Sequence, residues 1–172
     1  MLQQYGYLIR TIQDMNPTRD SRLQKLVVLL ILLPLTVGII HAQETRFSRD
    51  SAFAVLKVLA GDIGPRPMGS PSEKRALDYA VSKFAAYGCQ ESYVMPFARA
   101  WTTNTTSGIA VGILKGRTGR IILIGGHIDS AGPEIPGAND DASGAACVIE
   151  LARVMGGHQH ESTIVFCCWG GE

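Results

Sequence analysis

The apolar positions between residues 121 and 169 predict two strands joined by a helix. Residues 121–124 are all Ile or Leu and are followed by Gly125 and Gly126, which is typical of a short strand buried on both faces. Residues 163–169 form a second apolar run. Between the two runs, apolar residues recur at helical spacing, at Ala145, Val148, Ile149, Ala152 and Met155. This order predicts a right-handed crossover with parallel strands, whose carboxyl ends lie at the same edge of a sheet.

Two amphipathic helices are predicted before these strands. The first begins at Asp50 and ends at Gly61. Its expected buried face consists of Phe53, Leu56, Leu59 and Ala60. The second begins with Ser70 as its cap, Pro71 at the first helical position and Glu73 three residues after the cap, which is the pattern of a capping box. Its expected buried stripe consists of Leu77, Ala80, Val81 and Phe84, and Gly88 ends it.

Two further stretches have the composition of strands, residues 91–98 and residues 109–114. A turn at residues 116–119, which follows the second stretch, contains two glycines. We expect this turn to fold the second stretch back onto residues 121–124 as a β-hairpin. The sequence contains no internal repeat.

The first forty-odd residues have the pattern of a targeting segment. Basic residues precede an apolar run at residues 26–40, and the small residue Ala42 follows. The run has about fifteen residues, fewer than the roughly twenty that span a bilayer. We therefore predict that residues 1–42 are a signal peptide and that the protein is secreted or extracytoplasmic. The alternative is a signal anchor that retains the protein on a membrane through residues 26–40. Met15 is an alternative start.

Charge and cysteine content narrow the possible partners. With 16 basic and 15 acidic residues, the formal net charge is +1, so there is no electrostatic case for a nucleic-acid partner. The four cysteines contain no CxxC pair. We expect Cys147, Cys167 and Cys168 to pack as small apolar side chains, and a disulfide involving Cys89 stays open.

Metal-type ligands gather after the first of the two parallel strands. His127 and Asp129 lie two positions apart on extended chain, so the carboxylate can hydrogen-bond the far nitrogen of the imidazole. Asp140 follows at the start of the next helix, although an Asn-Asp-Asp run is also a common helix cap. The crossover should bring Glu172 to the same edge. A histidine with carboxylates suits zinc, with cobalt or manganese as substitutes.

Three blocks of the sequence, GGHIDS, PGANDDASGAACVIELARVM and STIVFCCWGGE, resemble family twenty-eight of the metallopeptidases. This family contains co-catalytic zinc aminopeptidases related to bacterial leucyl aminopeptidase, aminopeptidase Y and glutamate carboxypeptidase. The resemblance extends from about residue 51 to the last residue and includes GPRPMGS at residues 64–70. It implies a three-layer α/β fold in which helices cover both faces of a mixed, mostly parallel sheet. Residues 43–172 would be the amino-terminal part of the catalytic domain, incomplete at the carboxyl end.

The resemblance also assigns roles to the four residues. His127 would bind one of two zinc ions, Asp140 would bridge both, Asp129 would orient His127, and Glu172 would be the general base. A second glutamate, a zinc ligand in the family, would follow Glu172. The expected function is therefore that of an exported zinc aminopeptidase, inactive as a 172-residue chain alone. We also expect residues 164 and 166 to lie near an open sheet edge.

Two other functions remain open on the sequence. The first is a carboxypeptidase or a glutaminyl cyclase of the same fold, although cyclases depart from the pattern at the histidine of the first block, which is intact here as His127. The second is a receptor-like homologue without catalytic activity. For the enzyme, the expected partner is a peptide or amino-acyl substrate. No oligomeric state is predicted.

Overall fold

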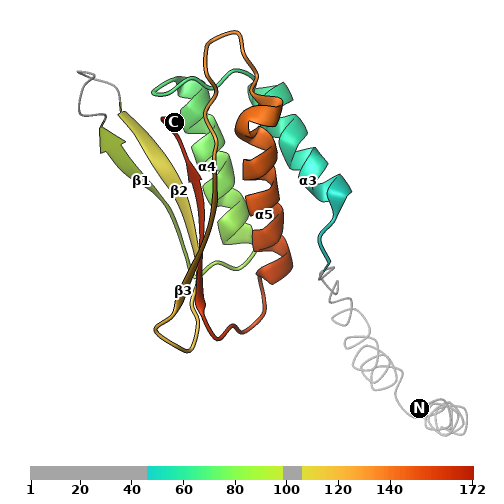
Figure 1. Ribbon diagram of the computed structural model, residues 1–172, viewed down its shortest axis with the longest axis vertical. Coiled ribbons are helices and arrows are strands. Elements are labelled where there is room, and N and C mark those ends of the chain that lie inside the picture. The colour runs from blue at the N-terminus through green and yellow to red at the C-terminus, as the bar shows by residue number, and fades with distance from the viewer. Residues whose placement is uncertain (1–45, 99–105) are drawn as a thin grey trace, which may run out of the picture. The chain divides into compact units, whose positions relative to one another are not determined.

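A four-stranded mixed sheet organises the computed structural model, which describes residues 46–98 and 106–172 (Figure 1). The strands are β1 (Glu91–Ala98), β2 (Thr106–Leu114), β3 (Ile121–His127) and β4 (Thr163–Trp169), in the spatial order β1-β2-β4-β3. β3 and β4 are parallel, as the crossover pattern predicts, whereas β1 pairs with β2 and β2 with β4 in antiparallel fashion. The predicted targeting segment, residues 1–42, lies outside the described residues.

The predicted hairpin between β2 and β3 is wrong, because β4 lies between these two strands. The turn that was expected to close the hairpin instead pairs with the chain just before β4. The N–H groups of Arg117 and Thr118 donate to the carbonyls of His160 and Glu161, at 3.1 and 2.9 Å. The connection between β2 and β3 therefore passes the beginning of β4. β4 lies inside the sheet, between β2 and β3, and its side chains are buried along most of its length.

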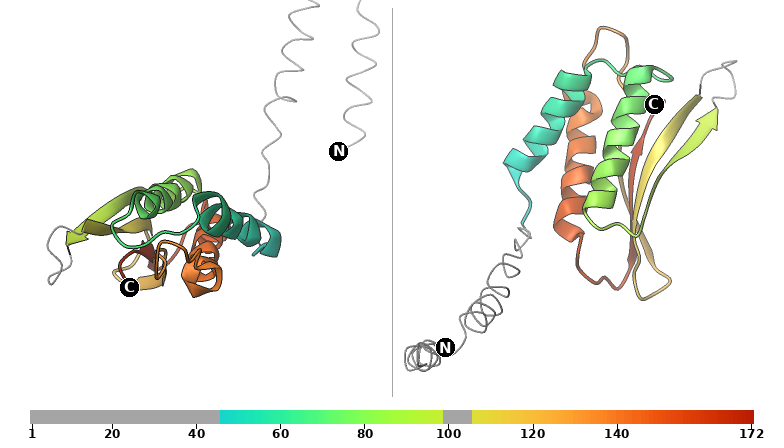
Figure 2. Two further views of the ribbon diagram at one scale, coloured as in Figure 1. Left: turned by 90° about the horizontal axis from the view of Figure 1, so that it is seen from above. Right: turned by 180° about the vertical axis from the view of Figure 1, so that it is seen from behind.

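Three helices lie along one face of the sheet (Figures 1 and 2). They are α3 (Arg49–Leu56), which continues into a π-helical segment at Lys57–Ile63, α4 (Pro71–Ala86) and α5 (Ser143–Met155). α4 and α5 pack against the strands, and α3 packs against α5. The expected class, a mixed sheet with helices, is confirmed. Within the part of the chain that the structure describes, only the β3 and β4 pair is parallel and no helix covers the second face.

The start of α4 confirms half of the predicted capping box. The Ser70 hydroxyl accepts the N–H of Glu73 at 3.1 Å. The Glu73 carboxylate does not return to the N–H of Ser70, but accepts the N–H of Gly69 at 2.6 Å and the hydroxyl of Ser107 at 2.6 Å. Glu73 is therefore buried on the same side of α4 as the apolar stripe. That stripe consists of Ala76, Leu77, Ala80 and Phe84, while Val81 is only half-buried.

The predicted buried face of the first helix is only partly correct. Phe53 is 54% exposed, whereas Ala52, Val55 and Leu59 are buried. The helix packs against α5 rather than directly on the sheet. The face that it buries there is rotated from the predicted one. The helical turns also continue past Gly61 to Ile63, and Gly64 follows with a φ of 78°.

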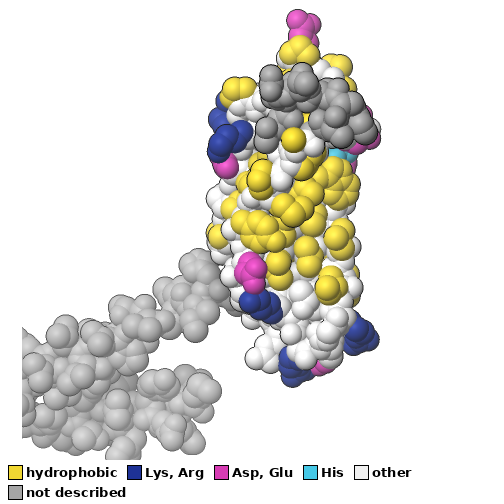
Figure 3. All heavy atoms as spheres, turned by 90° about the vertical axis from the view of Figure 1, so that its left-hand side faces the viewer, with side chains coloured by type: hydrophobic (Ala, Val, Ile, Leu, Met, Phe, Trp, Pro, Cys, Tyr) yellow, Lys and Arg dark blue, Asp and Glu magenta, His cyan; other side chains and the backbone are white. Residues whose placement is uncertain are grey.

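The sheet face away from the helices carries exposed apolar side chains, which Figure 3 shows as a broad hydrophobic area. The expectation that β3 is buried on both faces is wrong, since Ile121, Ile122 and Leu123 are 69%, 50% and 65% exposed. These residues lie on an edge strand without a covering layer among the described residues. The expectation for Ile164 and Phe166 is also wrong. Both are buried, because β4 is central and not at the edge.

The cysteines follow the packing prediction in part. Cys167 and Cys168 are buried in β4, but Cys147 is exposed on α5, so its expected role in the core is wrong. All four cysteines, including Cys89, are free. None of the helices within residues 46–98 and 106–172 is long and apolar enough to cross a membrane.

Candidate metal centre

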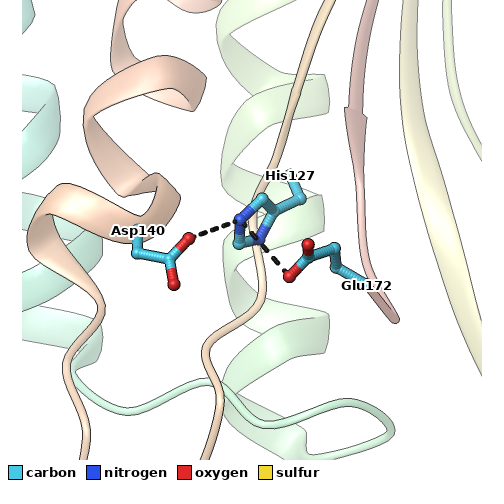
Figure 4. Close-up of side chains that lie close together, drawn as sticks. All are labelled: His127, Asp140 and Glu172. Atoms are coloured by element: carbon cyan, nitrogen blue, oxygen red, sulfur yellow. Dashed lines mark hydrogen bonds and ion pairs between the residues drawn. The ribbon is translucent and has the colours of Figure 1, made fainter.

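Three predicted site residues converge at the carboxyl edge of β3 and β4 (Figure 4). His127 is the last residue of β3, Glu172 follows β4, and Asp140 belongs to the turn at Ala138–Ala142 that precedes α5. The Nε2 atom of His127 lies 3.0 Å from Oδ1 of Asp140 and 3.7 Å from Oε2 of Glu172. The parallel pairing of β3 with β4 produces this convergence, because it aligns His127 with Trp169 at the strand ends. The predicted juxtaposition is confirmed, and the chemical roles stay predictions.

Asp129 lies on the opposite side of the imidazole. Its Oδ1 atom is 3.3 Å from Nδ1 of His127, and its Oδ2 atom accepts the backbone N–H of Glu172 at 3.3 Å. The side chain of Asp129 is only 7% exposed, and that of His127 12%, whereas those of Asp140 and Glu172 are 79% and 66% exposed. One buried carboxylate thus contacts both the histidine ring and the main chain that carries the predicted base.

The two consecutive aspartates before α5 have different contacts. Asp141 accepts the N–H of Gly144 at 2.9 Å and so caps the first turn of α5. Asp140 directs its carboxylate away from the helix, toward His127 (Figure 4). Asp141 therefore caps the helix, as the capping alternative predicts, and Asp140 is free to act as a metal ligand. The turn begins at Gly137, whose left-handed backbone (φ 56°, ψ 46°) favours glycine.

The carboxylates determine the electrostatics around the imidazole. Burial lowers the pKa of His127, but the hydrogen bond to Asp140 and the negative charges of Asp129, Glu172 and Asp141 raise it by more. The net result is a pKa above the ordinary value of 6.5. A site that stabilises positive charge on a histidine in this way also favours a bound cation.

The donor set fits a divalent metal. One ligand atom from each of His127, Asp140 and Glu172 lies within 4.8 Å of the others, and one imidazole with two carboxylates is a zinc-type combination. Nδ1 of His127 and Oδ1 of Asp129 are buried and face each other at 3.3 Å, yet neither makes a hydrogen bond among the described residues. Metal ligation through Nε2 requires the proton on Nδ1, where it would meet this carboxylate oxygen. The two partnerless atoms are therefore those that metal binding would pair.

Two buried charged residues near the site were not predicted from the sequence. Arg66 and Glu73 are both fully buried, whereas the capping pattern gives Glu73 a role only at the start of α4. The signal for Glu73 was its spacing, because it lies four residues before Leu77 on the buried stripe of α4. Gly170, just after β4, packs so closely against Glu73 and Ser107 that a side chain there would collide with both. Glu73 thus helps to fix the path of the chain toward Glu172.

Comparisons with known proteins show that part of the chain is similar to a known family. Residues 110–172 match the model described as "Peptidase family M28". A "Probable zinc metalloprotease" of Pyrenophora tritici-repentis is 45% identical over 60 residues, which make up 31% of this chain and 12% of that protein. The chain therefore corresponds to only a small part of this relative's length.

Two solved structures share the fold. A zinc aminopeptidase from Bacillus subtilis, BSAP, matches with a TM-score of 0.67 and 16% identity, over 74% of this chain and 63% of that one. A glutaminyl cyclase from Tannerella forsythia matches with a TM-score of 0.63 and 23% identity, over 73% of this chain and 47% of that one. Together with the family match, these findings confirm that the chain resembles peptidase family M28.

Proposed function

We propose that this chain contributes to a zinc-dependent exopeptidase, an aminopeptidase that removes the first residue of a peptide. The observation that carries the proposal is the convergence of His127, Asp140 and Glu172, with ligand atoms within 4.8 Å of one another, inside the segment that matches a peptidase family. Peptide hydrolysis at neutral pH needs a stronger nucleophile than water and a positive charge near the developing oxyanion. A metal centre with an adjacent carboxylate supplies both.

The residues divide the work according to their burial. His127, held in a nearly buried position beside Asp129, would bind one zinc ion, and Asp140, whose carboxylate is exposed, would serve as a ligand shared with a second ion. Two zinc ions at this place would acidify a water molecule and polarise the scissile carbonyl. Glu172, with its side chain 66% exposed and its N–H held by Asp129, would accept the proton and deliver it to the leaving amine.

We further propose that the protein is exported. The support is the basic segment followed by the apolar run at residues 26–40 and the small residue Ala42. A zinc aminopeptidase in that location would act on extracytoplasmic peptides.

The test measures hydrolysis of leucine p-nitroanilide by the full-length product of the gene that encodes this chain. A chelator should abolish activity, and zinc should restore it. Because Glu172 is assigned as the base, Glu172→Gln should lower kcat by about 100-fold to 10,000-fold while zinc affinity falls much less. Glu134→Gln, which changes an exposed glutamate in the loop after β3, is the matched control and should leave kcat unchanged.

Two results would contradict the proposal. Activity that resists the chelator would exclude a metal mechanism, and wild-type turnover in Glu172→Gln would remove Glu172 from the reaction. The same preparations are assayed for cyclisation of an amino-terminal glutamine. Cyclisation without peptide hydrolysis would favour the glutaminyl cyclase alternative, whose fold this chain also shares.

A further inference from the structure

Arg66 is the largest fully buried side chain among the described residues, with an exposed fraction of 0%. Burial lowers the pKa of its guanidinium, and the nearby charge of Asp129 raises it in part. An arginine remains protonated even when its pKa is lowered, so this is a buried positive charge. No ion pair within 4 Å involves Arg66 in the described ranges, and main-chain carbonyls solvate its charge instead.

Three of those carbonyls come from two of the segments that build the candidate metal centre, the end of β3 and the turn before α5. Nε of Arg66 donates to the carbonyl of Ile128 at 2.7 Å, and Ile128 lies between His127 and Asp129. Nη1 lies 2.9 Å from the carbonyl of Pro136, and Nη2 lies 3.5 Å from the carbonyl of Gly137. The guanidinium therefore connects the end of β3 with the beginning of the turn that presents Asp140.

The same side chain also holds its own segment. Nη1 donates at 2.6 Å to the carbonyls of Leu59 and of Gly64, which belong to the region between α3 and α4. The main chain of Arg66 forms a reciprocal pair with Ser130, since its N–H donates to the Ser130 hydroxyl at 2.8 Å and its carbonyl accepts the Ser130 N–H at 3.0 Å. Three stretches of chain therefore meet at one planar cation.

Gly137 connects the Arg66 guanidinium to the turn that carries Asp140. Its carbonyl also accepts the N–H of Ala142 at 3.1 Å, which closes the turn that contains Asp140. A side chain at Gly137 would collide with the carbonyl of Asp140 and press on Ser130. The main chain of Asp140 therefore has little room to move relative to the guanidinium.

We propose that Arg66 is a positioning residue that sets the separation between His127 and Asp140, and that it thereby sets the zinc affinity of the centre. This inference rests on the proposed function. Arginine suits the role because its planar fork offers five donors in fixed directions, whereas lysine offers a compact charge that cannot span the same carbonyls. A purely structural buried arginine would affect stability but not metal binding.

The test compares Arg66→Lys with Arg153→Lys, which alters another nearly buried arginine. The Arg153 side chain is 13% exposed and pairs with Glu150 on α5, away from the metal centre. Zinc affinity is measured by calorimetric titration of the same full-length protein that the activity test uses, and stability is measured by urea unfolding. Arg66→Lys should weaken zinc binding by about 10-fold to 100-fold, the range found for residues that orient metal ligands. Arg153→Lys should lose stability with zinc affinity unchanged.

A readout in the metal-free protein separates positioning from general damage. Hydrogen exchange of the Ala142 and Ser130 amides should accelerate in Arg66→Lys and stay unchanged in Arg153→Lys, because only the first change releases the turn. If Arg66→Lys does not fold, Ser130→Ala provides the second variant. It removes the hydroxyl that accepts the Arg66 N–H but leaves the charge in place, and it should weaken zinc binding by about threefold to tenfold.

The outcomes are distinguishable. If Arg66→Lys binds zinc as tightly as the wild type does, the role of Arg66 is overturned and the proposed function stands. Where Arg66→Lys does not fold, the same holds for Ser130→Ala. A wild-type chain that binds no zinc overturns the metal centre itself, and the inference about Arg66 fails with it. Weaker zinc binding in Arg66→Lys and also in Arg153→Lys assigns the effect to lost stability and overturns positioning.

Discussion

Replacing Asp129 by asparagine tests the metal centre most directly, because the change removes a charge and one acceptor without altering shape. Asp129 has two contacts that both need an acceptor. Oδ1 faces Nδ1 of His127 at 3.3 Å, and Oδ2 accepts the N–H of Glu172 at 3.3 Å. An asparagine has only one oxygen, so its NH₂ group must face one of these two nitrogens.

The conflict arises only when metal binds. In the metal-free protein, His127 can carry its proton on Nε2, beside Asp140, and its bare Nδ1 can accept from the asparagine NH₂. Zinc ligation through Nε2 moves the proton to Nδ1, where it would meet a second donor. A buried donor left without an acceptor costs about 1–3 kcal/mol, which weakens binding by about fivefold to 150-fold. This agrees with the roughly 10-fold to 100-fold effect of residues that orient metal ligands.

Calorimetric zinc titration and urea unfolding measure the two sides of this argument. Asp129→Asn should weaken zinc binding within the stated range while the unfolding curve retains its slope. The matched control is Asp141→Asn, which removes a nearby negative charge but keeps the cap of α5, since asparagine caps as well as aspartate. If both variants lose zinc affinity equally, the effect is one of net charge. If Asp129→Asn binds zinc as the wild type does, Asp129 has no part in the centre.

Two further predictions concern parts of the chain outside the metal centre. Burial raises the pKa of Glu73 above its ordinary 4.5, although the hydrogen bonds from Ser107 and Gly69 lower it in part, so the folded protein holds this proton at pH values where the unfolded chain has lost it. The contribution of Glu73 to stability is therefore complete below about pH 4.5 and is lost as pH rises through the raised pKa. Glu73→Gln should flatten the dependence of the thermal-unfolding midpoint on pH in this range. A wild-type pH dependence in the variant would exclude Glu73 as its source. A signal peptide cleaved after Ala42 would leave Gln43 as the first residue of the secreted protein, which amino-terminal sequencing can check, whereas mature protein that retains residues before Leu26 would indicate an anchor.

The local patterns of the sequence determined most elements of the fold. The span of β4, the Ser70 cap with Pro71 at the first position of α4, and the extent of α5 all follow from apolar spacing and from the residues that begin and end helices. The convergence of His127, Asp140 and Glu172 could also be predicted, because a parallel crossover brings strand ends to one edge. These features depend on contacts close in sequence or on a nearly invariant handedness.

Other features were decided only by the tertiary structure. The sequence did not reveal that β4 enters between β2 and β3, since each of these strands could pair with either neighbour and only the burial of the whole sheet selects the order. It also could not show that Arg66 is buried. A charged residue can be buried only where distant segments supply its hydrogen-bond partners, and the carbonyls of Ile128 and Pro136 meet Arg66 only after the chain has folded. Local patterns therefore determined that His127, Asp140 and Glu172 meet at one edge of the sheet, and long-range packing determined what holds them in place.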